Sequence, residues 1–74
     1  MKTKLTPVPM GTFWGCVAVN MSRVVGRKIT NINYVADICR GNKQNTELSP
    51  IAKSCVKTTL ADLRTQNMRP RYPV

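Results

Sequence analysis

The sequence predicts a single, mainly α-helical domain built from three helices, and three observations support this fold class. The chain has 74 residues, a length that suits one domain with one core. Apolar residues recur at three- and four-residue steps in three separate stretches, which places them on one face of a helix. Glycine, asparagine and proline separate these stretches. We therefore expect the helical domain over residues 10–68, with an extended basic arm at 1–9 and a basic tail at 69–74.

The first helix is predicted from Met10 to Val25. Thr12 is a candidate N-cap, and Gly26 is a natural stop directly after the last apolar residue of the pattern. The stretch TFWGCVAVN at 12–20 also alternates with a period of two and is rich in β-branched residues, so a strand is the alternative here. The predicted apolar face consists of Met10, Phe13, Trp14, Val17, Ala18, Met21, Val24 and Val25.

The second helix is predicted to begin after Thr30 or Asn31, either of which can cap it, and to end at Gly41. Residues 27–30 form a connector before it that could pair as a single β-strand. The segment GNKQNTE at 41–47 is polar and rich in turn-forming residues, so we expect a loop. The apolar face of this helix consists of Ile32, Val35, Ala36 and Cys39.

The third helix has the clearest start signal, Ser49-Pro50. Serine caps free N–H groups, and proline is accepted at the first helical position. Asn67 marks the predicted end, and the segment after it is expected to be an extended tail or one edge strand. The inward face consists of Ala52, Cys55, Val56, Thr59, Leu60 and Leu63.

Charge is the part of the composition that bears most on function. Twelve lysines and arginines face three acidic residues, which gives a net charge of +9. Such an excess attracts polyanions, namely DNA, RNA or an anionic membrane surface, although a basic surface that serves solubility alone is the alternative. The sequence contains no histidine, and three scattered carboxylates do not readily supply an acid/base pair. We therefore expect a protein that is not an enzyme and uses no cofactor.

The cysteines point to a reducing compartment. Cys16, Cys39 and Cys55 are odd in number and widely spaced, and three cysteines without histidine are too few for a zinc site. The first 21 residues resemble a signal peptide, but Pro7 and Pro9 interrupt the apolar stretch. No apolar run has the length of a membrane span. We expect a cytoplasmic protein with free thiols, no bound metal and no membrane partner.

Three helices in this order, the third with a basic outer face, are typical of a helix-turn-helix DNA-binding unit. The stretch TNINYVADICRGNKQNTELSPIAKSCVKTTLADLRTQNMRPRY at 30–72 resembles the winged helix-turn-helix regulators. Ala36 stands at the alanine position of their second helix, while Ser54, Val56, Leu60 and Leu63 match the pattern of their third. The resemblance implies transcription regulation and a wing of two strands, for which a stub remains at the end of the chain.

Cationic and hydroxyl side chains of the third helix are the candidate DNA contacts. Lys53 and Lys57 fall on the face opposite the apolar one, with Ser54 and Thr58 to one side, and such side chains reach phosphates and base edges when a helix enters the major groove. The positive end of the helix dipole near Ser49 adds affinity for phosphate. An ordinary solvated face is the alternative. The candidate set is Ser49, Lys53, Ser54, Lys57, Thr58, Arg64, Arg69 and Arg71.

The C-terminal residues Arg69, Arg71 and Tyr72 form a second group of candidates. The resemblance implies that basic wing residues contact phosphate or the minor groove, where arginine is favoured. A disordered tail is the alternative for this segment. We expect duplex DNA as the partner. Two other functions stay open, a small effector that binds and inhibits a host protein and a ribosome- or RNA-associated basic protein.

Overall fold

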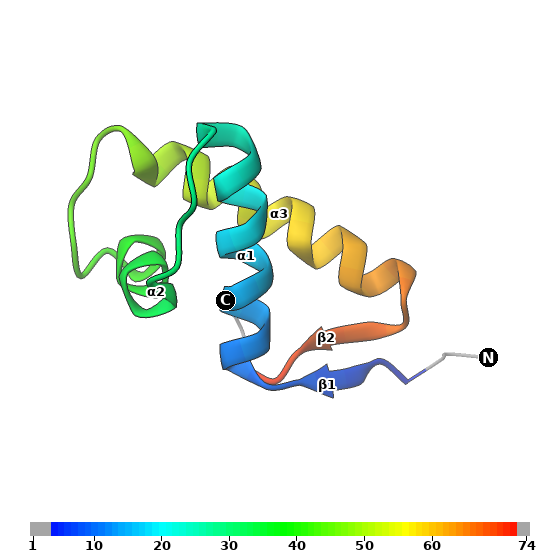
Figure 1. Ribbon diagram of the computed structural model, residues 1–74. Coiled ribbons are helices and arrows are strands. Elements are labelled where there is room, and N and C mark those ends of the chain that lie inside the picture. The colour runs from blue at the N-terminus through cyan, green and yellow to red at the C-terminus, as the bar shows by residue number, and fades with distance from the viewer. Residues whose placement is uncertain (1–3, 73–74) are drawn as a thin grey trace.

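The computed structural model describes residues 4–72, which form three helices and a short two-stranded sheet (Figure 1). The predicted mainly α-helical class with three helices is confirmed, and the β structure is minimal. Lys2, part of the predicted basic arm, lies outside the described residues. The elements in chain order are β1 (Thr6–Val8), α1 (Met10–Val25), α2 (Ile32–Arg40), α3 (Leu48–Thr65) and β2 (Met68–Pro70).

Helix α1 has the predicted bounds but a different start signal. Pro9 occupies the N-cap position, and its carbonyl accepts a hydrogen bond from the Phe13 N–H at 3.0 Å. The prediction of Thr12 as N-cap is wrong, because the helix begins at Met10 and Thr12 lies within its first turn. The strand alternative for this stretch is wrong as well. Gly26 and Gly41 end α1 and α2 as predicted, both in the left-handed conformation that glycine adopts without steric cost.

The connector between α1 and α2 is irregular. Asn31 caps α2, because its side-chain oxygen accepts the Tyr34 N–H at 3.1 Å, so one of the two candidate caps is confirmed. Residues 27–30 form no strand, and that prediction is wrong. The Ile29 N–H, which a strand partner would have satisfied, donates instead to the hydroxyl of Ser22 at 2.9 Å.

Helix α3 begins at Leu48, two residues before the predicted first helical residue Pro50, and Ser49 is not its cap. Glu47 occupies the N-cap position but its side chain makes no capping bond; the loop residue Asn45 caps the helix instead, because its side-chain oxygen accepts the N–H groups of Glu47 at 3.1 Å and Leu48 at 2.9 Å. Its backbone carbonyl also accepts the Ser49 N–H at 2.8 Å. Pro50 still lies in the first turn, where a missing N–H costs no helical hydrogen bond.

The two strands come from opposite ends of the described chain. After α3 the backbone turns through Asn67, which has a positive φ of 59° close to the predicted helix end. Strand β2 then runs parallel to β1, with Pro7 opposite Arg69, and the Thr6 N–H donates to the Asn67 carbonyl at 2.9 Å. The pair is therefore not a hairpin. It fastens the segment before α1 to the segment after α3 (Figure 1).

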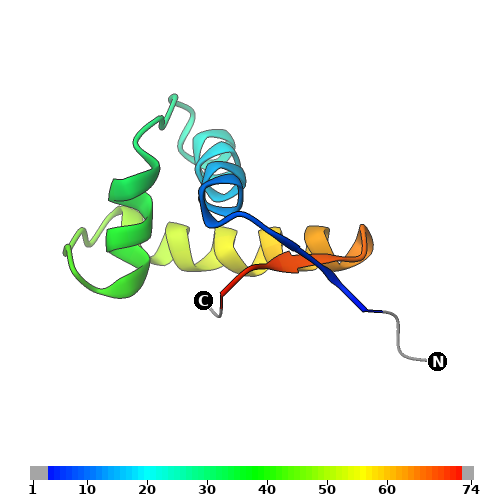
Figure 2. The same cartoon turned by 90° about the horizontal axis from the view of Figure 1, so that it is seen from below.

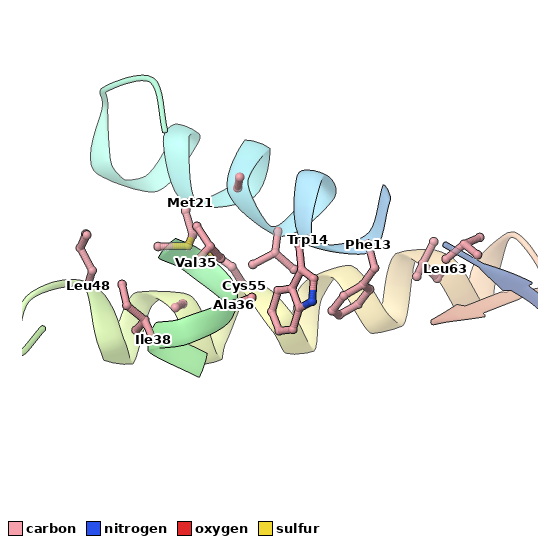
Figure 3. Close-up of a cluster of buried hydrophobic side chains, with 13 residues drawn as sticks. Phe13, Trp14, Met21, Val35, Ala36, Ile38, Leu48, Cys55 and Leu63 are labelled. Atoms are coloured by element: carbon pink, nitrogen blue, oxygen red, sulfur yellow. The ribbon is translucent and has the colours of Figure 1, made fainter. Parts of the chain in front are cut away.

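The core lies where α1 crosses α3 and where α2 closes the gap beside them (Figure 3). Phe13 and Trp14 meet edge to face, with ring centroids 5.0 Å apart, and fill the space between α1 and α3. The aromatic side chains thus serve the core. The buried apolar residues are Val8, Phe13, Trp14, Val17, Ala18, Met21, Val35, Ala36, Ile38, Leu48, Ala52, Cys55 and Leu63.

Burial differs from the predicted faces at a few positions. Val24 is 65% exposed although it continues the apolar pattern of α1. In α2, Ile38 is buried whereas Cys39 is half-buried. In α3, Val56 and Leu60 are half-buried. Helical periodicity gives the direction of a side chain, but burial also requires another element opposite it.

Thr59 is the one polar residue in the buried set of the described chain. Its hydroxyl donates to the Cys55 carbonyl one turn earlier and accepts from the side-chain amide of Asn20 in α1, both at 2.8 Å. Both hydrogen-bonding functions of the hydroxyl are thereby satisfied. This pair ties α1 to α3 and fixes which face of α3 points away from the core.

Candidate nucleic-acid interface

The outer face of α3 carries a row of cations. Lys53, Lys57 and Arg64 are all exposed, and their spacing of four and seven residues keeps them on one side of the helix. Ala52 and Leu63 each precede one of these cations, so they lie about 100° away round the helix, and they are buried. Figure 2 shows α1 packed along one side of α3, and the structure brings these three predicted residues together on another side, where all three are exposed.

The hydroxyl side chains of the candidate set lie beside the cationic row. Ser54 and Thr58 are exposed and one turn apart. The Thr58 hydroxyl donates to the Ser54 carbonyl at 3.2 Å, a bond within the helix that uses its proton. Its oxygen lone pairs stay available, so in this rotamer Thr58 can accept a hydrogen bond from a ligand.

A hollow of about 450 Å³ lies at the N-terminal end of α3. Three cations line it, Arg40 from the last turn of α2, Lys43 from the loop and Lys53 from α3. Ser49, which sequence analysis proposed as cap and phosphate contact, also lines this hollow and is half-buried. No carboxylate is among the lining residues, so the hollow is suited to an anion.

Sequence reasoning missed Arg40 and Lys43 as functional candidates. The Arg40 guanidinium lies 5.9 Å from the centre of the Trp14 ring, and the Lys43 ammonium lies 5.4 Å from that of Tyr34. Cations placed over aromatic faces are held in position by the negative face of the ring. Arg40 stands in the last turn of a helix, where basic residues are common, and Lys43 stands in a loop. Nothing in the sequence indicates that these two residues lie near the start of α3.

A second hollow, of about 700 Å³, lies at the C-terminal end of α3 between this helix and β2. Lys57, Arg64 and Arg69 line it together with apolar side chains. The Arg69 guanidinium is exposed and donates to the backbone carbonyls of Pro70 at 3.2 Å and Arg71 at 3.5 Å, which holds it along its own strand. Arg69 therefore lines the same hollow as Lys57 and Arg64 of α3, although it belongs to β2.

Arg71 lies apart from the row on α3. It is exposed and comes directly after β2, and it does not line the hollow beside that strand. Its N–H donates to the Val8 carbonyl at 3.0 Å, so its backbone continues the pairing with β1. The predicted extended tail is therefore held by the sheet up to this residue, while residues 73–74 lie outside the described chain.

Burial acts on two of the three thiols. Cys16, Cys39 and Cys55 are free cysteines. Burial raises the pKa of the Cys39 thiol, and the neighbouring Cys55 raises it further, although Lys53 acts in the opposite direction. Burial also raises the pKa of Cys55. The protonated form of these two thiols is therefore favoured, and a protonated thiol is a poor nucleophile and a poor metal ligand.

The described residues form neither a metal-binding cluster nor a membrane-spanning helix. Within residues 4–72, no three side chains of histidine, cysteine, aspartate or glutamate converge as a metal site would require. None of the helices described combines the length and the apolar character that crossing a bilayer takes. Comparisons of the chain with protein-family models, characterised proteins and solved structures find no match.

Proposed function

We propose that this chain is a non-catalytic protein that binds nucleic acid, preferably duplex DNA, through the outer face of α3, and that it acts as a transcriptional regulator. One observation carries the proposal. Lys53, Lys57 and Arg64 share one exposed face of α3, and each end of that face opens into a hollow lined by further cations and by no carboxylate. Clustered cations along one helix are the electrostatic footprint of nucleic-acid binding.

The dimensions of α3 suit the major groove of DNA. Lys53 and Arg64 are eleven residues apart, which corresponds to about 16 Å along the helix axis at the usual rise per residue. The major groove is about 12 Å wide, so cations with this separation can contact phosphates on both sides of it. Ser54 and Thr58 lie between the two ends and are the residues expected to meet base edges.

The hollow at the start of α3 supports the same arrangement. Arg40, Lys43 and Lys53 surround it, and the N–H groups of the first turn give this end of the helix a partial positive charge. A phosphate of the nucleic-acid backbone carries the complementary charge and fits such a site. In this proposal Arg40 and Lys43 hold one strand, while Arg64 and Arg69 hold the other.

The double variant Lys53→Ala, Lys57→Ala tests the proposal. Affinity for duplex DNA should fall with every sequence, and the slope of log affinity against log salt should become shallower by about two units, one for each phosphate that a lysine no longer neutralises. The measurement is fluorescence polarisation of labelled duplexes over a range of salt concentrations. The same titration with duplex RNA of equal length decides between the two forms of nucleic acid.

Arg27→Ala, Lys28→Ala is the matched control, because it removes the same charge from the connector after α1, which lies away from α3 (Figure 2). It should shift the affinity far less than the α3 variant. An equal effect of the two variants would mean that only net charge matters and would refute the interface. Absence of binding to any nucleic acid at low salt would refute the function itself. Ser54→Ala should instead alter the preference between sequences.

A further inference from the structure

The hollow beside β2 has a property that nucleic-acid binding does not use, an apolar floor. Phosphates are charged and the sugar rings present only small apolar patches to cover such a floor, and one aromatic ring is a small platform for stacked bases. Tyr72 is 60% exposed, which leaves a large apolar ring uncovered at its edge. The apolar lining consists of Leu5, Leu60, Ala61, Met68, Pro70 and Tyr72.

The rim of this groove is positively charged. Lys57 and Arg64 from α3 and Arg69 from β2 line it, and none of the three carboxylates of the chain does. An apolar floor with a purely cationic rim is complementary to a segment that is apolar on one face and acidic beside it. Charge complementarity of this kind favours specific partners and speeds their association.

The chain itself cannot supply such a segment. Asp37, Glu47 and Asp62 are its only acidic residues, and each is at least ten positions from the next. A second copy of the chain would bring the same +9 charge and would be repelled. The occupant is therefore not a segment of these 74 residues, and an acidic segment of a partner protein has the required charge.

The strands beside the groove indicate that this occupant is not a β-strand. Pro7 in β1 and Pro70 in β2 have no N–H to donate, so neither outer edge of the two-stranded sheet offers an unbroken row of donors. A helix satisfies its own backbone and requires only side-chain contacts. Amphipathic helices dock in hydrophobic grooves through apolar residues at three- and four-residue spacing.

We propose that the groove between α3 and β2 binds an acidic amphipathic helix of a partner protein. Apolar residues of that helix cover the floor around Leu5, Leu60 and Met68, and its carboxylates meet Lys57, Arg64 and Arg69 at the rim. Lys57 and Arg64 belong to the proposed nucleic-acid face as well. A bound acidic helix therefore competes with nucleic acid, which makes the groove a site where a protein partner can release this chain from DNA.

The test uses the full chain and a labelled synthetic helix of about 16 residues, with leucine at positions i, i+3, i+4 and i+7 and glutamate beside them. A peptide with the same residues in scrambled order and one with glutamine for glutamate are the comparisons. Fluorescence polarisation should show binding of the acidic amphipathic peptide, with at least about tenfold weaker binding of each comparison peptide, since both floor and rim are needed. Equal binding of the scrambled peptide would overturn the proposal.

The variant Leu5→Ser locates the site. Leu5 lines the groove but is not part of the core cluster, so the fold should survive, as a thermal melt would verify. Peptide affinity should fall about fivefold or more, because less apolar surface is covered when the peptide binds. Val24→Ser, at an exposed valine outside the groove, is the control and should leave peptide affinity within about twofold. Equal effects of these two variants would also overturn the proposal.

The DNA titration on the same variants separates the two proposals. Leu5→Ser should leave duplex affinity unchanged, and Lys53→Ala, which lies outside this groove, should leave peptide affinity nearly unchanged. Peptide binding without any DNA binding would refute the proposed function and would leave the proposed role of the groove unaffected. DNA binding without peptide binding would refute the proposed role of the groove and would leave the proposed function unaffected.

Discussion

Replacing Asn45 by alanine should destabilise the domain and disturb the cationic face of α3 through the same side chain. Asn45 lies in the loop between α2 and α3, and its side chain makes three hydrogen bonds. The oxygen accepts the N–H groups of Glu47 and Leu48, and the amide nitrogen donates to the Tyr34 hydroxyl at 2.9 Å. The residue thus sets the start of α3 and joins it to α2. Lys53, near that start, depends on this geometry.

The expected magnitude follows from these bonds. Loss of a capping side chain at a helix N-terminus costs about 1 kcal/mol, and loss of a partly buried hydrogen bond costs about 1 kcal/mol more. Asn45→Ala should therefore lower the free energy of unfolding by about 2 kcal/mol. For a domain of this size, each ~1 kcal/mol shifts Tm by about 4–8 °C, so Tm should fall by roughly 8–16 °C. Urea unfolding followed by circular dichroism measures the free energy directly.

Three variants serve as controls for this reasoning. Asn45→Asp keeps the oxygen that caps α3 but loses the amide donor to Tyr34, so it should cost about 1 kcal/mol or less, because a carboxylate is favourable at a helix N-terminus. Tyr34→Phe removes the bond to the Asn45 amide alone and should cost about half as much as Asn45→Ala. Asn42→Ala changes an exposed asparagine of the same loop and should stay within about 0.5 kcal/mol. If Asn45→Ala is no more destabilising than Asn42→Ala, the capping role is wrong.

Three further predictions concern stability. Gly15→Ala should raise the free energy of unfolding by about 0.5–1 kcal/mol in a urea titration, because its Cβ would meet nothing within 4 Å; a loss of stability would mean that the site is packed in solution. Thr59→Val should cost about 1–2 kcal/mol by leaving the Asn20 amide without its acceptor, and a neutral result would contradict that bond. The raised pKa values of Cys39 and Cys55 favour the protonated thiols in the folded state, so their contribution is intact below the ordinary value of 9.0 and is lost as pH rises through the folded values. Stability measured from pH 8 to pH 11 should fall less steeply in the double variant Cys39→Ala, Cys55→Ala, and an unchanged slope would contradict the assignment.

Helix ends show why some local predictions were confirmed and others were wrong. Gly26 and Gly41 end their helices as predicted, because a left-handed residue after a helix is a local requirement that glycine meets wherever it stands. The start of α3 is different. Ser49 and Asn45 can both cap a helix, and the Tyr34 hydroxyl, which belongs to another helix, holds the Asn45 side chain in place. That choice depends on a tertiary contact, which local sequence does not contain.

The candidate interface on α3 could be predicted only in part, because some of its residues meet through tertiary contacts. The row of Lys53, Lys57 and Arg64 follows from helical spacing within one segment, so the sequence alone was enough to place these residues on one face. Arg40 and Lys43 join them at the N-terminal hollow because α2 and the loop pack there, which no spacing rule describes. The groove beside β2 likewise requires a strand that pairs with residues more than 60 positions earlier in the sequence.

By itself, the sequence determined the number of helices, their apolar and cationic faces and the excess of positive charge. These are properties of short segments and of composition, and the 3.6-residue period of a helix converts them directly into geometry. Only the tertiary structure decided that the chain closes through a parallel pair of strands and that cations from three segments surround the ends of α3. Contacts between segments distant in sequence depend on the packing of the whole core, and that packing determines which side chains meet.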